Sequence, residues 1–123
     1  MITGIGTDIC SIPRMQKAIA NSYFLHRVFC EPEIEYARSK SGHARHYAAA
    51  FAAKEAFAKA TGLGLFGVGL KSVWVVRTEY GPKFAYDEEL TERLESMGVS
   101  NSWLSITHEA DLALAFVVME SKR

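Results

Sequence analysis

The sequence has 123 residues, of which 49% are hydrophobic and 23% are charged, and this composition predicts one folded domain and excludes a disordered or fibrous chain. Its 14 basic and 14 acidic side chains balance, so the chain lacks the overall positive field that attracts nucleic acid without sequence preference. Two cysteines are too few for a secreted disulfide framework, the first residues do not resemble a signal peptide, and no apolar run is long enough to cross a bilayer. We therefore expect one cytoplasmic domain, residues 1–123, with neither a nucleic acid nor a membrane as its partner.

The first elements in chain order are a strand and short helices. Residues 2–10 are apolar and punctuated by glycine, which predicts a strand whose end delivers Asp8 to a neighbouring element. Ser11, with proline two residues later, predicts a helix that runs to about residue 20. Residues 21–30 are mixed and predict no definite element, whereas residues 33–39 predict a second helix that ends in a glycine-containing loop.

The second half begins with an alanine-rich helix at residues 43–60, which Gly62 should end. Glycines at positions 62, 64, 67 and 69 then predict a flexible loop outside the core. Further elements follow at residues 73–76 (strand), 83–86 (strand), 87–98 (helix), 103–108 (strand) and 112–119 (strand). This order of mixed helices and strands indicates the α+β class.

Glu55 is the anomalous residue of the long helix, because its neighbours are alanines and phenylalanines. Phe51, Glu55 and Lys59 are four residues apart and share one face. In one interpretation Glu55 and Lys59 form a surface ion pair worth a few tenths of a kcal/mol. In the other, Glu55 faces Asp8, and the two carboxylates hold a magnesium ion that completes its octahedron with water and phosphate oxygens.

Two lysines lie beside this glutamate, and both can serve phosphate chemistry. Lys54 is adjacent to Glu55, and Lys59 lies one helical turn further on. Carboxylates with nearby lysines are what phosphoryl transfer requires, because the protein has to position the groups and neutralise the charge that develops on oxygen. Lysines on alanine-rich helices are also common as solubilising residues, so both interpretations stay open.

Further candidates for phosphate binding occur before the long helix and near the end of the chain. Ser105, Thr107 and His108 offer hydroxyl and imidazole groups, although a lone histidine before a turn is more often structural. The segment before and within the start of the long helix carries five basic side chains: Arg38, Lys40, His43, Arg45 and His46. These five residues form either a solvated surface or a second phosphate contact.

Three motifs together resemble one enzyme family. GIGTDI at residues 4–9, FAAKEAFAKATGLG at residues 51–64 and LSITH at residues 104–108 are similar to the signatures of the holo-acyl carrier protein synthase type of 4′-phosphopantetheinyl transferase. They occur in the family's order and spacing, and the resemblance extends over nearly the whole chain. It implies the 4′-phosphopantetheinyl transferase fold, in which a small antiparallel sheet packs with one long helix and shorter helices.

The resemblance also implies a reaction in fatty acid biosynthesis. Asp8 and Glu55 would hold Mg²⁺, with Mn²⁺ as an alternative, and the metal would bind the pyrophosphate of coenzyme A, the co-substrate. A serine of apo-acyl carrier protein would attack the β-phosphate, and adenosine 3′,5′-bisphosphate would leave, with Lys59 adding positive charge beside it. Catalytic roles therefore fall to Asp8, Glu55 and Lys59.

Binding roles follow from the same resemblance. Lys54 and the segment with Ser105, Thr107 and His108 match phosphate and nucleotide contacts. Arg14 on the first helix matches a position that faces the acidic carrier protein. Family members of this size form homotrimers with coenzyme A sites between subunits, and we expect the same here.

The chain departs from the family pattern at two positions. Ala50 stands where many relatives have an arginine before the FAxKE motif, and His46, one turn earlier, or Arg45 beside it are the candidates to replace that arginine. Tyr23 stands where a relative can carry a second docking arginine.

The group that accepts the serine proton is open between Glu55, a metal-activated water and His108. We favour water relayed by Glu55, since a metal-bound carboxylate is a poor base by direct contact.

Two other functions fit the same residues. A metal-dependent hydrolase would cleave the pyrophosphate of coenzyme A or a nucleotide with water, and the docking face around Arg14 distinguishes the transferase from it. A trimeric module without catalysis would bind coenzyme A or a carrier protein, and the missing arginine at position 50 motivates this alternative. The retained acidic pair and Lys59 argue against a pure binding role.

Overall fold

A three-stranded antiparallel sheet and one long helix organise the structure, a computed structural model that describes residues 1–122. The helices and strands in chain order are β1 (Ile2–Ser11), α1 (Ile12–Ala18), α2 (Ser22–Val28), α3 (Glu31–Arg38), α4 (His43–Thr61), α5 (Gly64–Val68), β2 (Val73–Thr78), β3 (Gly81–Tyr86), α6 (Glu88–Ser96), β4 (Val99–Glu109) and β5 (Leu112–Ser121). The α+β class predicted from the sequence is confirmed.

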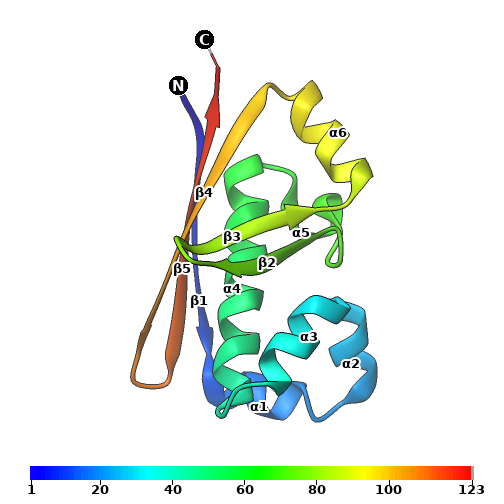
Figure 1. Cartoon of the computed structure of the whole chain (residues 1–123), viewed down its shortest axis with the longest axis vertical. Coiled ribbons are helices and arrows are strands. Elements are labelled where there is room, and N and C mark those ends of the chain that lie inside the picture. The colour runs from blue at the N-terminus through cyan, green and yellow to red at the C-terminus, as the bar shows by residue number, and fades with distance from the viewer. Residues whose placement is uncertain (123) are drawn as a thin grey trace.

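The strands form two separate sheets around α4. In the larger sheet the order is β1-β5-β4, so the first and last strands of the chain are neighbours. The hairpin of β2 and β3 is a second sheet that lies across α4 (Figure 1). Helices α1 to α3 gather at one end of α4, and α6 lies towards the other end, where both chain termini are found (Figure 1). Within residues 1–122, no helix has the length and apolarity needed to cross a membrane.

Two glycines of β1 let this strand approach α4 closely. A Cβ atom built on Gly6 would lie 1.9 Å from the carbonyl oxygen of Ala56, and one on Gly4 would lie 1.8 Å from that of Ala60. Both distances are far below van der Waals contact, so a side chain at either position has no room. The glycine pattern of the first strand and the alanines of the long helix therefore belong to one packing arrangement.

Two hydrophobic clusters share α4. The first combines the C-terminal half of α4 with β2, α6 and β5, and the second combines its N-terminal half with α1, α2 and α3. Cys10 and Ile106 pack against both clusters. The end of β1 that carries Asp8 therefore lies near the boundary between the two halves of the core.

Several element boundaries differ from the prediction. The Ser11 side chain caps α1 by accepting from the Arg14 amide at 3.3 Å, as expected, but the helix ends at Ala18. Residues 21–30, which predicted no definite element, contain α2, which Asn21 caps by accepting from the Phe24 amide at 3.1 Å. Strand β4 begins at Val99, four residues before its predicted start.

The predicted flexible loop between the long helix and β2 is wrong, because this segment contains α5. Gly62, Gly64 and Gly69 all have a positive φ, between 74° and 91°, and these glycines terminate α4 and bracket α5. Val68 is 5% exposed and belongs to the core. The glycines therefore mark helix ends and not a mobile loop.

The face of the larger sheet that points away from α4 is apolar and exposed. Ile5 is 58% exposed, Ile9 55%, Trp103 55% and Phe116 39%. On the opposite face, Ala113, Ala115, Val117 and Met119 of β5 are buried on the side of α4. One face of the larger sheet thus packs into the core, and the other is an apolar surface that a single chain leaves exposed.

Candidate active site

Asp8, Glu55 and Lys59 lie together where β1 passes α4. Lys59 Nζ donates to the Thr7 carbonyl oxygen at 2.9 Å and to Asp8 Oδ1 at 3.3 Å. Burial raises the pKa of Glu55 most, the negative charge of Asp8 raises it further, and the ammonium of Lys59 lowers it. These mutual effects place both carboxylates and the ammonium in one electrostatic cluster.

The ion pairing of Lys59 differs from a simple helix-surface pair. Lys59 forms its salt bridge with Asp8 on the strand, and residues 1–122 contain no salt bridge between Lys59 and Glu55. The Lys59 side chain is 56% exposed and that of Asp8 20%, so the cluster opens to solvent on one side. Glu55 is half-buried and has no ion-pair partner in the described part of the chain.

Cys10 and Arg14 border this cluster. Burial raises the pKa of the Cys10 thiol, Asp8 raises it as well, and Arg14 lowers it. Arg14 is exposed in the first turn of α1, directly after the Ser11 cap. The sequence analysis did not single out Cys10 as a neighbour of the acidic pair, although its position two residues after Asp8 on one strand places both on the same face.

The structure corrects the expectation for Lys54. Its side chain is fully buried, and its ammonium pairs with Glu33 Oε1 at 2.9 Å on the side of α4 that packs against α3 and β2. It also donates to the carbonyl oxygens of Leu70 and Val73. An ammonium with all three donors engaged inside the protein has none for a phosphate.

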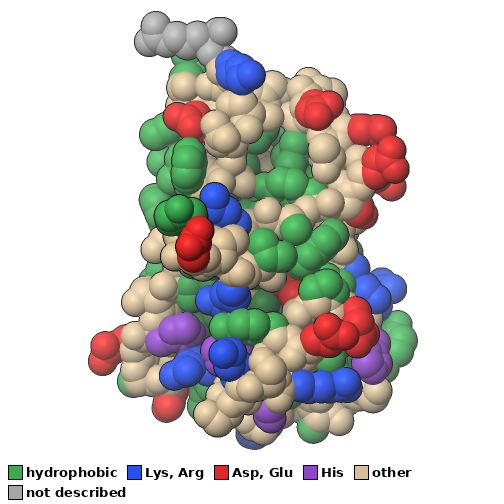
Figure 2. Space-filling model, viewed as in Figure 1, with side chains coloured by type: hydrophobic (Ala, Val, Ile, Leu, Met, Phe, Trp, Pro, Cys, Tyr) green, Lys and Arg blue, Asp and Glu red, His purple; other side chains and the backbone are tan. Residues whose placement is uncertain are grey.

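A cationic cluster forms around His46, whose ring packs against Tyr36, at some distance along α4 from the acidic pair. We use this name for Arg45 and His46 of α4, Arg77 of β2 and His108 of β4. Arg77 lies 5.1 Å from the centre of the Tyr36 ring, and the His46 ring meets the same ring edge-on at 5.3 Å. Figure 2 shows basic and histidine side chains gathered in the lower half of this face, and acidic side chains over α6.

The two histidines of the cationic cluster are both perturbed. Burial lowers the pKa of His46 and of His108, and the positive charges of Arg45 and Arg77 lower both further. His46 Nδ1 is buried and has no hydrogen-bond partner among residues 1–122. An unsatisfied ring nitrogen among cations is a feature that a bound anion would satisfy.

Arg77 is the member of this cluster that the sequence analysis missed. It follows a β-branched run on β2 and belongs to none of the three motifs, although the resemblance to the family also extends over residues 73–77. The antiparallel hairpin of β2 and β3 brings it next to α3 and α4. Ala50, at the position of the expected arginine, is 6% exposed and one turn after His46.

The segment with Ser105, Thr107 and His108 is divided between the two faces of the sheet. His108 pairs with Ala113, which is buried on the α4 side, whereas Ser105 pairs with Phe116 on the outer face. Thr107 shares that outer face, since side chains alternate along a strand. Within one chain, the two hydroxyl residues therefore lie on the far side of the sheet from the acidic pair.

The acidic pair offers two carboxylates to a metal ion and no third protein ligand. Among residues 1–122, no group of three or more histidine, cysteine, aspartate or glutamate side chains is arranged to hold a metal. A hard cation such as Mg²⁺ accepts one or two carboxylates when water and phosphate oxygens complete its shell. The donor set of Asp8 and Glu55 fits this kind of site.

Comparisons with known proteins give a consistent result. Residues 4–117 match the profile of the 4′-phosphopantetheinyl transferase superfamily. The holo-[acyl-carrier-protein] synthase of Clostridium botulinum (strain Eklund 17B / Type B) is 39% identical over 121 residues, which is 98% of each chain. The crystal structure of the corresponding synthase from Neisseria meningitidis superposes with a TM-score of 0.92 at 37% identity, covering 98% of this chain and all of the other. The synthase from Bacillus anthracis, solved in complex with coenzyme A (3′,5′-ADP), has a TM-score of 0.81 at 32% identity and 99% coverage of both chains.

Proposed function

This chain belongs to the 4′-phosphopantetheinyl transferase superfamily, and we propose that it carries out its transfer at the cluster of Asp8, Glu55 and Lys59. The reaction moves the 4′-phosphopantetheine group of coenzyme A to a serine of apo-acyl carrier protein and releases adenosine 3′,5′-bisphosphate. The observation that carries the assignment of the site is the ion pair that joins Asp8 on β1 to Lys59 on α4 beside Glu55. In this proposal residues 1–123 form one transferase domain.

Asp8 and Glu55 are the proposed ligands of a divalent metal, Mg²⁺ or Mn²⁺. Two carboxylates whose charges act on each other, one on a strand and one on a helix, form the hard oxygen site that such cations prefer. The metal, when bound, supplies positive charge to the bridging oxygens of the pyrophosphate. Lys59 contributes a second positive charge at the edge of the same site.

The chain's own residues then perform three tasks in the transfer. Lys59 holds positive charge where the leaving phosphate gains negative charge. Asp8 and Glu55 would hold the metal, and a cation held there would orient the pyrophosphate for the carrier serine. Glu55 accepts the serine proton through a water, and the position of His108 in the cationic cluster, away from the acidic pair, argues against the imidazole as the base.

The cationic cluster is the proposed contact for a second phosphate of coenzyme A. Arg45 and His46 were expected there, and His108 of β4 and Arg77 of β2 join them. The buried, unpartnered nitrogen of His46 supports an anion at this place. We propose that His46, Arg45 and Arg77 together replace the arginine that Ala50 lacks.

A homotrimer is proposed on the basis of the exposed outer face of the larger sheet. Its apolar residues, with Ile9 and Trp103 both 55% exposed, match the composition of surfaces that subunits cover. Ser105 and Thr107 lie on this same face, away from the acidic pair of their own chain. In the proposed trimer, Ser105 and Thr107 of one subunit would contact the coenzyme A that is bound at the acidic pair of a neighbouring subunit. Each coenzyme A site would then lie between two subunits.

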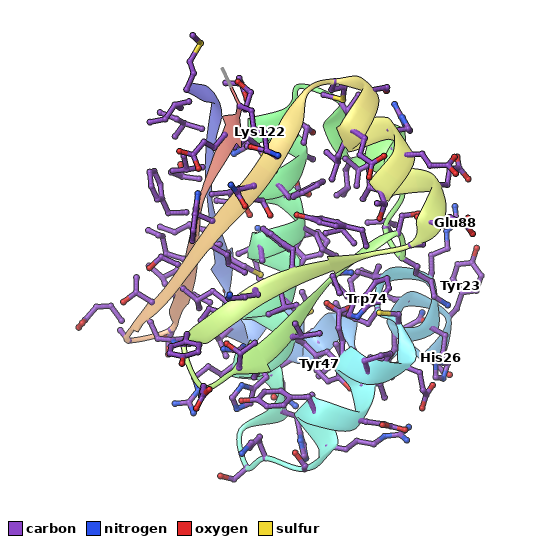
Figure 3. All side chains as sticks on the ribbon, turned by 45° about the horizontal axis from the view of Figure 1, so that its top comes forward. Tyr23, His26, Tyr47, Trp74, Glu88 and Lys122 are labelled. Carbon is purple, nitrogen blue, oxygen red and sulfur yellow. The ribbon has the colours of Figure 1, made fainter. Side chains whose placement is uncertain are left out.

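The carrier protein is proposed to dock on α1 and α2. Residues 9–30 contain no aspartate or glutamate, but they contain Arg14, Lys17, His26 and Arg27. Such a surface attracts an acidic partner. Figure 3 shows Tyr23 and His26 on the outer side of α2, and Tyr23 is 76% exposed, so an aromatic ring takes the position of the expected second arginine.

The test is the intact mass of an apo-acyl carrier protein after incubation with this protein, coenzyme A and Mg²⁺. We expect a gain of one phosphopantetheine, which the Asp8→Asn, Glu55→Gln double variant should lose while it keeps its fold. Lys122→Met, an exposed change at the end of β5, serves as the control and should transfer normally. A double variant as active as the parent would refute the proposed metal site, and hydrolysed coenzyme A without transfer would favour a hydrolase.

A non-catalytic binding module is the second alternative that this experiment addresses. It would retain coenzyme A without modifying the carrier or the nucleotide. The separation of the cationic cluster from the acidic pair allows this result to be recognised, because coenzyme A would bind in the double variant as tightly as in the parent.

A further inference from the structure

The ammonium of Lys54 is the most completely enclosed charge in the described part of the chain. Its side chain has no exposed surface, and its three donors are used by Glu33 Oε1 at 2.9 Å, the Val73 carbonyl at 2.6 Å and the Leu70 carbonyl at 2.8 Å. The ammonium also lies 6.0 Å from the centre of the Phe29 ring. Every donor is therefore satisfied within the protein.

Glu33 completes the network from the side of α3. Its Oε1 also accepts from the Cys30 amide at 3.2 Å and from the Cys30 thiol at 3.5 Å, and its Oε2 accepts from the Val75 amide at 3.4 Å. The pair of Glu33 and Lys54 thus ties α3, α4 and the start of β2 to one point. Among these contacts, the one between Val75 and Glu33 joins residues 42 positions apart in sequence.

Two of these elements, α4 and β2, carry proposed ligand-binding residues, and α3 packs against them. Helix α4 carries Glu55 immediately after Lys54, α3 carries Tyr36, and β2 carries Arg77. Neighbouring residues on an α-helix point about 100° apart, because each turn takes 3.6 residues. The hydrogen bonds of Lys54 to its three acceptors fix the orientation of α4 about its own axis. The same orientation therefore sets the direction in which Glu55 points.

We propose that Lys54, paired with Glu33, is a positioning residue for the transfer, which orients Glu55 and holds the cationic cluster in place. This inference rests on the proposed function of the acidic pair. The attraction within a buried ion pair roughly offsets the cost of removing its two charges from water, so the pair adds little net stability. An apolar pair of similar volume often replaces such an ion pair without loss of stability. The geometry of the network therefore points to orientation of the site as its main contribution.

The double variant Glu33→Met, Lys54→Met tests this role, because it removes both charges and leaves no buried charge without its ion-pair partner. We expect a folded protein with a urea midpoint below that of the parent, because the carbonyls of Leu70 and Val73 and the amides of Cys30 and Val75 lose their partners. We also expect Mn²⁺ binding weaker by about tenfold and a similar fall in kcat, as for other residues that orient a metal ligand. Lys122→Met is the matched control, since Lys122 is exposed at the end of β5 (Figure 3). A folded double variant with parental Mn²⁺ affinity and parental kcat would overturn the proposal.

A second variant covers the case in which the double variant does not fold. Glu33→Gln keeps the volume and an acceptor oxygen but removes the charge that holds Lys54. We expect its folded fraction to bind Mn²⁺ less tightly, and unchanged Mn²⁺ affinity would refute the positioning role.

A further readout separates this inference from the proposed function itself. If the parent binds no Mn²⁺ and transfers nothing, the metal site fails whatever the variants do. The ring resonances of His46 then decide the positioning role: they should shift in the Glu33 variant and stay unchanged in Lys122→Met. Unshifted His46 resonances would contradict the proposed link between the buried pair and the cationic cluster.

Discussion

Lys59 Nζ lies 3.3 Å from Asp8 Oδ1, so an ion pair joins the long helix to the first strand at the proposed metal site. The same ammonium donates to the Thr7 carbonyl at 2.9 Å, which fixes it over the strand. A positive charge at this point has two opposite effects on the reaction. It competes with a divalent cation for Asp8, and it stabilises negative charge on a departing phosphate.

Replacement of Lys59 by methionine should therefore separate metal binding from catalysis. We expect tighter Mn²⁺ binding, because the competing ammonium is gone, and a kcat lower by about 10² or more, because the transition state loses a charge. Titration of Mn²⁺ by electron paramagnetic resonance and the rate of carrier modification measure the two effects. Lys59→Arg should retain part of the rate, whereas a loss of Mn²⁺ affinity in Lys59→Met would contradict this account.

Gly6→Ala should destabilise the fold strongly. The added Cβ would lie 1.9 Å from the Ala56 carbonyl oxygen, and backbone cannot yield as a side chain can, so a loss of about 3 kcal/mol or more is expected. Urea denaturation measures it. The matched control is Gly67→Ala in α5, whose nearest contact is Leu63 Cβ at 3.4 Å, and it should be neutral or stabilising by about 0.5 kcal/mol. Equal effects at the two positions would refute the close approach of β1 to α4.

The histidines of the cationic cluster should make stability depend on pH. Their pKa values are lowered in the folded state, so the unfolded chain binds more protons just below pH 6.5, and the free energy of unfolding rises with pH in that range. The contribution is complete above about pH 6.5 and is lost as the pH falls through the lowered pKa values. The His46→Gln, His108→Gln variant should flatten this dependence in urea titrations between pH 5 and 8. An unchanged slope would show that these imidazoles titrate normally.

The replacement for the missing arginine at position 50 is testable through substrate affinity. Arg45→Ala and His46→Ala should each raise the Michaelis constant for coenzyme A several-fold, by roughly 1 kcal/mol per lost charged contact, with kcat little changed. Steady-state kinetics with a fixed carrier concentration measures this. Ala50→Arg in the His46→Ala background should restore part of the affinity. If both single variants kept the parental Michaelis constant, the cationic cluster would not be a coenzyme A contact.

The outer face of the sheet should govern assembly. Phe116→Lys places a charge on this face, where Phe116 is 39% exposed, and should convert the assembly to folded monomers with greatly reduced transfer. Native mass spectrometry and circular dichroism distinguish dissociation from unfolding. Phe66→Lys is the control, because Phe66 is 91% exposed on α5, and it should assemble normally. An intact oligomer in Phe116→Lys would exclude this face as the interface.

The sequence predicts the larger elements of the fold well, because their signals are local. The alanine-rich residues 43–60 predict a helix, and α4 confirms it; the strand at residues 2–10 also lies within the observed β1. The segment with Gly64 and Gly69 was predicted wrongly, since a glycine-rich sequence does not distinguish a mobile loop from a short helix bounded by positive φ angles.

The candidate site is less accessible from the sequence, because its chemistry depends on which way side chains turn. Lys54 and Lys59 look equivalent around Glu55, yet one is buried against Glu33 and the other reaches Asp8. A helix position alone gives the direction of a side chain only after its neighbours are known. Arg77 lies outside the three motifs, and only the packing of β2 against α3 and α4 places it over Tyr36.

Successive side chains of strand β4 alternate between two surfaces of the molecule. From Ser102 onward, its even-numbered residues, which include His108, turn towards α4, and its odd-numbered residues, which include Ser105 and Thr107, turn towards the outer face. One inserted or deleted residue between Trp103 and His108 would exchange the two sets while leaving the composition almost unchanged. Such a change would remove the imidazole from its arginine neighbours and the hydroxyls from the subunit boundary together. The spacing within this segment is therefore as much a functional constraint as the residue types it contains.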